Sequence, residues 1–558
     1  MAKMDKLKRN LLVMFMDAFR GVSLLMTHYP MHEQKKILKA VLKRTKDTEV
    51  YRKYGLTQSM SIEEFKKKVP LTTYVDYEAF VKKMMDDNAK DVLTKDEIVF
   101  YTVTSGTTSK KSKIIPHTKE SLSRQSVLTY VAMANIIKEL YTQGKYFDKG
   151  VNFISTKNDG NNKYGIPYGL GSCQPQYFMG RRMKGDNQRI VPAECCMISG
   201  ERLEYICWLF ALSSDKVTFL ATIYPLYMIS AYNTLQRRAN ELLTDLEKGT
   251  LSEDLQIPEE LRKQVLRYLK PNVKRAEEIR RILQECGYMK PTQIWPKLTC
   301  IVTARGGTSK YYVSQIEELF DGIPVFCPTF NASEGMGAFG YSAKDEMITS
   351  ISSTFLEFIP MDKTNEENPE TLLINEVKVG ELYEIVFTVV NGFYRYRMGD
   401  IVKITGFIHK TPKLEFQYRS GSMLSVAYEK VTEDEIIAVM SDIIRELNLK
   451  VKTFVVGVDY NKSDKPNYKI VLESDEQYSK EVKNEILSMF EKGLMNKNVC
   501  FEKVFGGGMI APTILYLVKD KTIEQYYSKG KENTNQVKIS HISENEDFWR
   551  HIYEEQVD

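Results

Sequence analysis

The 558-residue sequence lacks several patterns that identify common classes of protein. Its eight cysteines form no C-x-x-C pair and its six histidines no H-E-x-x-H motif, so a zinc site held by protein side chains is not expected. Cysteines without a paired spacing predict reduced thiols in a cytoplasmic protein. No apolar run approaches the length of a membrane span, and the early run at residues 11–16 predicts an amphipathic N-terminal helix, not a signal peptide or an anchor.

An excess of charge of one sign is also missing. The 78 basic and 73 acidic side chains leave a net charge of +5, so neither a nucleic acid nor a membrane is an expected partner. A hydrophobic fraction of 43% and a charged fraction of 27% are ordinary for a soluble globular protein. The chain exceeds the roughly 250–300 residues that one hydrophobic core usually holds, so at least two domains are expected.

The pattern of apolar residues changes along the chain. Up to about residue 95 the spacing is helical, as at Ile37, Leu38, Val41 and Leu42. From residue 98 to residue 227, short apolar strands alternate with helical segments, which predicts an α/β core.

Charged residues and a small-residue boundary mark the rest of the chain. Residues 232–286 read as helices, and their charges, Arg238 among them, are expected to form a solvated face. The small residues after Arg419 mark a boundary. Past it, a compact α+β unit is predicted, with strands at 451–458 and 468–472 and helices at 433–447 and 480–490. We therefore expect a large N-terminal domain, residues 1–419, and a small mobile C-terminal domain, residues 420–558.

The segment T-V-T-S-G-T-T-S-K-K-S-K-I-I-P-H-T, residues 102–118, follows an apolar strand at residues 98–100. Such residues can surround a polyphosphate, because glycine lets the backbone approach the anion while hydroxyls and a lysine offset its charge. The Walker spacing G-x-x-x-x-G-K-[ST] is absent, so a solvated Ser/Thr/Lys hairpin stays an equal alternative. The candidate phosphate ligands are Ser105, Gly106, Thr107, Thr108 and Lys113.

A second cluster, T-F-N-A-S-E-G-M-G at residues 329–337, follows an apolar strand at residues 323–327. It contains one carboxylate, Glu334, among small residues. An acid in this setting suits a metal ion that is bound to phosphates. The alternative is a Gly-rich turn with an exposed glutamate.

A third cluster, G-F-Y-R-Y-R-M-G-D, begins a strand predicted at residues 392–407. Its alternation puts the aromatic residues on one face and Arg395 and Arg397 on the other. Asp400 follows at its end, where a carboxylate can accept hydrogen bonds from a ribose diol. The alternative is a structural strand whose two arginines are matched to surface acids.

The three clusters, in this order, resemble the adenylate-forming superfamily of acid-activating enzymes. Within it, the chain most resembles the Gretchen Hagen acyl-acid amido synthetases, named for auxin-responsive proteins and found beyond plants. The resemblance covers nearly the whole chain. It rests on six segments: S-G-T-T-S-K-K-S-K-I-I-P at 105–116, T-D-L-E-K-G-T-L-S-E-D-L at 244–255, W-P-K-L-T-C-I-V-T-A-R-G-G-T-S-K-Y-Y at 295–312, F-N-A-S-E-G at 330–335, Y-R-Y-R-M-G-D at 394–400 and N-Q-V-K at 535–538.

The resemblance implies an α/β adenylate-forming fold and an enzyme that uses ATP and Mg²⁺. It would activate a carboxylic acid as an acyl adenylate and join it to an amine, in this family usually an amino acid. The implied catalytic residues are Lys113, Glu334 and Lys538, with Glu334 placing the magnesium ion. The implied nucleotide ligands are Ser105, Gly106, Thr107 and Thr108 at the phosphates, Phe330 and Asn331 near the adenine, Asp400 at the ribose and Arg419 at the nucleotide and the interdomain hinge.

The chain departs from the family pattern at four positions. Lys110 stands where a second glycine is usual, Phe330 replaces a common tyrosine, and Ser540 and His541 stand where Pro-Arg is common. Two other functions stay open, an acyl-CoA ligase of the same fold and a nonenzymatic nucleotide-binding protein. The sequence identifies neither the acid nor the amine.

Overall fold

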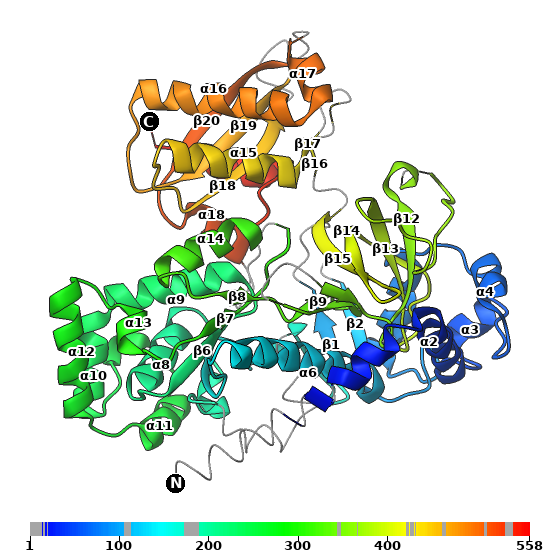
Figure 1. Cartoon of the computed structure of the whole chain (residues 1–558), viewed down its shortest axis with the longest axis horizontal. Helices are drawn as coiled ribbons and strands as arrows, with labels where there is room; N and C mark the ends of the chain where they lie inside the picture. Colours follow the sequence, from blue (N-terminus) through cyan, green and yellow to red (C-terminus); the bar gives the residue numbers. More distant parts are fainter. Residues whose placement is uncertain are drawn as a thin grey trace. The chain divides into compact units, whose positions relative to one another are not determined.

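A computed structural model gives the fold and describes residues 14, 17–18, 20–104, 113–171, 189–307, 309–342, 347–364, 366–419, 423–424, 429, 431–459, 465–506, 510–529 and 539–557. The chain divides into two compact units, Met1–Phe416 and Gln417–Asp558 (Figure 1). The expected assignment of separate roles to residues 1–419 and 420–558 stays a prediction.

The first unit begins with amphipathic helices. Helix α2 (Pro30–Arg44) has a proline in its first turn, where a missing N–H removes no intrahelical hydrogen bond. Its apolar stripe of Ile37, Leu38, Val41 and Leu42 is buried, which confirms the helix predicted from their spacing. Three shorter helices follow, α3 (Glu49–Lys53), α4 (Ile62–Lys68) and α5 (Val75–Asp87).

A four-stranded sheet in the order β2-β1-β5-β4 comes next. Strand β1 pairs antiparallel with β2 and parallel with β5. The bounds are β1 (Ile98–Val103), β2 (Ile114–Thr118), β4 (Gly160–Asn161) and β5 (Pro167–Gly169). Helix α6 (Lys119–Thr142) follows β2 at once, because the Thr118 side chain caps it by accepting a hydrogen bond from the Ser121 N–H.

A parallel sheet in the order β3-β6-β7-β8 forms the α/β part of this unit. Its strands are β3 (Lys149–Asn152), β6 (Val217–Ala221), β7 (Cys300–Val302) and β8 (Val325–Phe326). The elements between them include η3 (Ala193–Cys196), α8 (Glu201–Leu212), α9 (Pro225–Arg237) and α14 (Ser309–Leu319). Helix α8 packs on β3 and α9 (Figure 1). This arrangement confirms the predicted α/β core.

A helical region lies between β6 and β7, as the sequence predicts. After α9 it consists of α10 (Ala239–Lys248), η4 (Glu253–Leu255), α11 (Glu259–Tyr268), α12 (Val273–Cys286) and α13 (Pro291–Ile294). Helices α10 and α12 pack on each other.

A seven-stranded sheet in the order β12-β13-β14-β15-β11-β10-β9 completes the first unit. Its strands are β9 (Thr329–Asn331), β10 (Met336–Gly340), β11 (Met347–Thr349), β12 (Phe355–Pro360), β13 (Leu382–Thr388), β14 (Tyr396–Ile408) and β15 (Thr411–Arg419), with η5 (Met361–Lys363) after β12. A Cβ atom at Gly335 or Gly337 would lie 3.2 Å from the Phe387 ring. Strands β10 and β13, which are not neighbours in the order, therefore face each other.

The second unit is built on a three-stranded sheet in the order β18-β19-β20. The strands of this sheet are β18 (Thr453–Asp459), β19 (Asn467–Glu473) and β20 (Ala511–Val518). Two further strands, β16 (Met423–Leu424) and β17 (Val431–Thr432), form a separate pair. The helices of this unit are α15 (Glu433–Glu446), α16 (Lys480–Lys497), α17 (Val499–Gly506), α18 (Thr522–Ser528) and α19 (Glu546–Glu555). The predicted α15, α16, β18 and β19 are confirmed, with shifted ends.

Two general features complete the description. Within the ranges that the structure describes, no helix combines the length and the apolar composition that crossing a bilayer requires. Free thiols are found at Cys195, Cys196, Cys207, Cys286, Cys300 and Cys327.

A buried carboxylate gives the second unit a predicted pH dependence. Glu473 on β19 is 4% exposed and accepts a hydrogen bond from the Ile523 N–H at 2.7 Å. Burial raises the pKa of Glu473 from 4.5 to about 7, and the nearby Asp520 and Glu524 charges add to this. Below pH 4.5 the carboxyl is protonated in both the folded and the unfolded chain. As the pH rises through 7, ionisation destabilises the folded state by about 3 kcal/mol, at 1.36 kcal/mol per pKa unit.

Glu473→Gln should abolish this loss, because an amide stays neutral at every pH. We expect the variant to gain stability relative to the parent between pH 5 and pH 8. Hydrogen exchange of the peptide at residues 519–526, measured in the full chain at both pH values, checks this. A parent and a variant that show the same change in protection would contradict the raised pKa.

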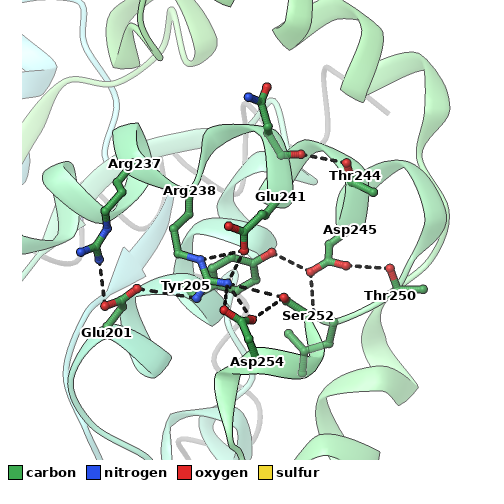
Figure 2. Close-up of polar contacts among 12 residues, drawn as sticks. Glu201, Tyr205, Arg237, Arg238, Glu241, Thr244, Asp245, Thr250, Ser252 and Asp254 are labelled. Atoms are coloured by element: carbon green, nitrogen blue, oxygen red, sulfur yellow. Dashed lines mark hydrogen bonds and ion pairs between the residues drawn. The ribbon is translucent and has the colours of Figure 1, made fainter.

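The segment at residues 244–255, which is part of the family resemblance, forms the end of α10 and the turn after it. Asp245 is buried and accepts three hydrogen bonds, from the Tyr205 hydroxyl at 2.6 Å, the Thr250 hydroxyl at 2.7 Å and the Ser252 N–H at 2.7 Å (Figure 2). Gly249 ends the helix with a φ of +69°, a conformation that favours glycine. The motif is therefore a structural junction.

The prediction that Arg238 lies on a solvated face is wrong. Its side chain is 8% exposed and lies over the Tyr205 ring, 4.5 Å from the centroid. It pairs with Glu201, Glu241 and Asp254, which belong to different turns of the chain (Figure 2). The guanidinium joins α8, α10 and η4, because its planar fork of donors can bind several carboxylates at once.

Asp245→Ala should destabilise the first unit by about 3 kcal/mol, because buried donors are left without an acceptor. Thr244→Ala is the matched control, since Thr244 is exposed and its hydroxyl donates to the Asn240 carbonyl in the same helix. Chemical denaturation of both variants measures the difference. Equal stability of Asp245→Ala and the control would rule out this role for Asp245.

Candidate active site

Lys113 directly precedes β2 and lies next to the end of β1. Thr104 and Lys113 close this end of the pair: the Thr104 N–H donates to the Lys113 carbonyl at 2.9 Å, and the Lys113 N–H donates to the Thr104 hydroxyl at 3.0 Å. The predicted phosphate ligands Ser105, Gly106, Thr107 and Thr108 lie outside the described residues, so their role stays a prediction. What the structure describes is the antiparallel pair of strands that precedes and follows them.

The Lys113 side chain meets Glu334 through a third residue. Its Nζ donates to the Tyr396 hydroxyl at 3.2 Å, and that hydroxyl donates to Glu334 Oε1 at 3.0 Å. The ammonium also lies over the Tyr74 ring, 5.8 Å from the centroid. The structure thus brings together two predicted catalytic residues, Lys113 from just before β2 and Glu334 from the turn between β9 and β10. They meet at the hydroxyl of Tyr396, the first residue of β14.

Glu334 is not the exposed residue of a flexible turn. It is 6% exposed, and the turn around it is closed by a hydrogen bond from the Ala332 N–H to the Gly335 carbonyl at 2.9 Å. A Cβ atom at Gly335 would lie 2.9 Å from Val389, so glycine allows this close approach. The alternative of an exposed glutamate is wrong.

The predicted strand at residues 392–407 begins later than expected, at Tyr396. Arg395 has a φ of +45°, a left-handed conformation that breaks the alternation. Its guanidinium is buried and forms a bidentate pair with Glu357 at 2.9–3.0 Å. Arg397 pairs with Glu384, which is also buried. The arginines are therefore structural, as the alternative held, but their acids are in the interior and not on the surface.

Asp400 lies inside β14 and not at the end of a strand, which corrects the prediction. The register of β14 against β13 shifts between the pairs Glu384↔Ile401 and Val386↔Arg397, and Gly399 in this bulge has a φ of +78°. Asp400 is 2% exposed. Its contact with a ribose stays a prediction and requires the carboxylate to become accessible when a nucleotide binds.

Phe330 and Asn331 lie on β9, four and three residues before Glu334. The Phe330 ring is stacked on Phe416, with 5.2 Å between centroids. A Cβ atom at Gly337 would lie 2.6 Å from the Phe330 ring. Asn331 is exposed, and its amide offers both a donor and an acceptor. An aromatic ring beside an exposed amide suits a purine, and the contact of these two residues with adenine stays a prediction.

The two remaining predicted residues belong to the second unit. Arg419 is the last residue of β15. Lys538 and the boundary residues 420–422 lie outside the described residues, so the hinge and the role of Lys538 stay predictions. Ser540 and His541, which replace the usual Pro-Arg, both donate to Glu433 Oε1, at 2.9 and 2.6 Å.

A magnesium ion fits this site only as a partner of the nucleotide. Among the residues that the structure describes, no group of three or more His, Cys, Asp or Glu side chains is placed to hold a metal. Glu334 offers one carboxylate beside the Lys113 ammonium. An ion that arrives on a nucleotide needs only one or two protein carboxylates, so this donor set fits such an ion.

Sequence reasoning missed the hydroxyl that joins the two charges. Tyr396 and Tyr394 alternate in the same run, and nothing in the sequence separates a bridging phenol from a core residue. His117 on β2 is buried, and its Nε2 lies 3.0 Å from the Thr102 hydroxyl. Burial lowers the pKa of His117 to about 3, so the ring is neutral.

The fold is that of the adenylate-forming enzymes. A solved 2-hydroxyisobutyryl-CoA ligase with a bound acyl adenylate matches it with a TM-score of 0.53 and 12% identity, covering 94% of this chain and 90% of that one. A solved GH3.15 acyl acid amido synthetase matches with a TM-score of 0.82 and 22% identity, covering 96% of this chain and 95% of that one.

Family models narrow the class further. The GH3 family N-terminal domain matches residues 23–325, the central domain residues 347–419 and the C-terminal domain residues 434–547. The chain belongs to the GH3 family, which confirms the resemblance drawn from its motifs.

Relatives in this family are amido synthetases. Indole-3-acetic acid-amido synthetase GH3.2 of Arabidopsis thaliana is 27% identical over 74% of this chain and 78% of its own length. Jasmonoyl--L-amino acid synthetase JAR4 of Nicotiana attenuata is 24% identical over 83% of this chain and 82% of its own length.

Proposed function

We propose that this protein is an ATP-dependent acyl-acid amido synthetase, which activates a carboxylic acid as an acyl adenylate and transfers the acyl group to an amino acid. One observation supports it most: Lys113 and Glu334 approach the same Tyr396 hydroxyl. Membership of the GH3 family agrees with it. A cytoplasmic location, expected from unpaired cysteines, is part of the proposal.

In the first step the acid carboxylate attacks the α-phosphorus of ATP and pyrophosphate leaves. The Lys113 ammonium would bind the phosphate oxygens and offset the charge that builds up there, a role that needs no nucleophilic side chain. Magnesium bound to the nucleotide neutralises phosphate charge, and Glu334 would hold it. Ser105, Gly106, Thr107 and Thr108 would donate further hydrogen bonds to the phosphates.

In the second step the amine attacks the acyl carbon, an amide bond forms and AMP leaves. A reorientation of the second domain about the segment after Arg419, with Lys538 moving with it, would change the surroundings of the adenylate between the two steps. Asp400, Phe330 and Asn331 would keep the nucleoside in place through both steps.

A screen of acids tests the proposal. It starts with the acids named for the relatives, indole-3-acetate, jasmonate and 2,4-DB, and measures pyrophosphate release with ATP, Mg²⁺ and a mixture of amino acids. We expect release that depends on one class of acid, with an amide product identified by mass spectrometry. Release that requires coenzyme A in place of an amino acid would overturn the amide assignment, and ATP binding without any release would overturn the enzyme assignment.

A further inference from the structure

We infer that Tyr396 is a positioning residue that holds Lys113 and Glu334 in their reactive arrangement. The inference rests on the proposed function, because it concerns the same site. Its geometry is a chain of two hydrogen bonds: Lys113 Nζ donates to the Tyr396 hydroxyl at 3.2 Å, and the hydroxyl donates to Glu334 Oε1 at 3.0 Å.

A phenol suits this position because it accepts and donates at the same atom. By accepting from the ammonium, it directs the other two N–H groups of Lys113 away from Tyr396. By donating to Oε1 of Glu334, it leaves Oε2 to bind a cation. A direct contact between Lys113 and Glu334 would neutralise both charges, whereas the intervening hydroxyl keeps each charge for the ligand.

The ring of Tyr396 is fixed by its neighbours. It is fully buried and packs edge-on against Phe393 and Tyr77, with centroids 5.3 and 6.2 Å away. The backbone of Tyr396 lies beside Thr72. The Thr72 N–H donates to the Arg395 carbonyl at 2.9 Å, and the Thr72 carbonyl accepts from the Arg397 N–H at 2.8 Å. A phenol held at both ring and backbone has little freedom to lose, so its two hydrogen bonds are preorganised.

The ion pairs of the two arginines beside Tyr396 also fix the position of its backbone. Arg395 is bound to buried Glu357, and Arg397 to buried Glu384. One pair lies on each side of Tyr396 in the sequence, so the strand start that presents the phenol is anchored on both sides. The residues of the Y-R-Y-R run therefore act together to position the Tyr396 hydroxyl.

Tyr396→Phe tests the inference, because it keeps the ring and removes the hydroxyl. The matched control is Tyr394→Phe, which removes a buried hydroxyl from the same run, on a ring that packs against Phe65 and Tyr54. The probe is α,β-methylene-ATP, and calorimetry gives its affinity over a range of Mg²⁺ concentrations. We expect Tyr396→Phe to weaken binding by about tenfold or more and to raise the Mg²⁺ concentration at half-maximal binding, since hydrogen bonds to charged groups are lost. The control should stay within about twofold.

A double-mutant cycle adds a measure that a purely structural role would not move. Because Tyr396 acts partly through Lys113 and partly through Glu334, Tyr396→Phe should weaken binding by a smaller factor in the Lys113→Met background than in the parent. Additive losses would overturn the inference. So would a folded Tyr396→Phe protein with the parent's affinity at every Mg²⁺ concentration.

The binding readout separates this inference from the proposed function. A parent protein that binds the probe but forms no amide would refute the proposed function and leave the binding test valid. A Tyr396→Phe variant equal to the parent in binding and in pyrophosphate exchange would refute the inference while the function stands. A parent that does not bind the probe would overturn both.

Discussion

Lys113→Ala is expected to slow acyl-adenylate formation by about a hundredfold or more, because a positioned cation at the transferring phosphoryl group contributes that much to transition-state stabilisation. The fold should survive, since the Lys113 side chain contacts the Tyr396 hydroxyl and the Tyr74 and Tyr396 rings and belongs to no buried ion pair among these contacts. ATP–pyrophosphate exchange in the presence of the acid measures the rate.

Lys110→Ala is the control for charge, because it removes a lysine from the same segment at a position where the family pattern has glycine. We expect it to keep most of the exchange rate. Exchange at the parent rate by a folded Lys113→Ala protein would show that this ammonium does not act on the phosphates.

Asp400→Ala is expected to weaken ATP binding by about tenfold or more while leaving the affinity for the acid unchanged, because a carboxylate that accepts hydrogen bonds from the ribose contacts the nucleotide alone. Asp400 is almost fully buried, so Asp400→Asn, which keeps its volume, is measured beside it. Calorimetry with α,β-methylene-ATP gives the nucleotide affinity of each variant, and calorimetry with the acid gives its affinity for the acid.

Glu381→Ala, which removes an exposed carboxylate next to β13, is the control for this pair of variants. Its ATP affinity should equal that of the parent. If Asp400→Asn and Asp400→Ala fold and also bind ATP like the parent, Asp400 has no contact with the nucleotide and serves only the bulge in β14.

The parts of this fold that the sequence predicts are those set by local pattern. The stripe of α2 follows from a periodicity of 3.6, and the strands β18 and β19 follow from short apolar runs; the structure contains them where the pattern places them. Lys113 and Glu334 could be proposed because each is a charged residue among small ones after an apolar strand.

Other features depend on contacts between distant positions, which no local pattern contains. Arg238 reads as a solvated charge, yet its acids come from residue 201 on one side and residues 241 and 254 on the other. The bulge at Gly399 moves Asp400 into the interior of β14, and Arg395 breaks the alternation with a positive φ. Tyr396 was placed on a face, but its partners lie 283 and 62 residues away.

The central claim is that the acid is activated as an acyl adenylate and ends as an amide. The most direct measurement uses the acid that gives the fastest pyrophosphate release, with both carboxylate oxygens labelled with ¹⁸O, in a reaction with ATP, Mg²⁺ and the preferred amino acid. Mass spectrometry then locates the label. The account predicts one ¹⁸O atom in AMP and one in the amide product. Label in orthophosphate, formed together with ADP, or a labelled product that is not an amide, would contradict it.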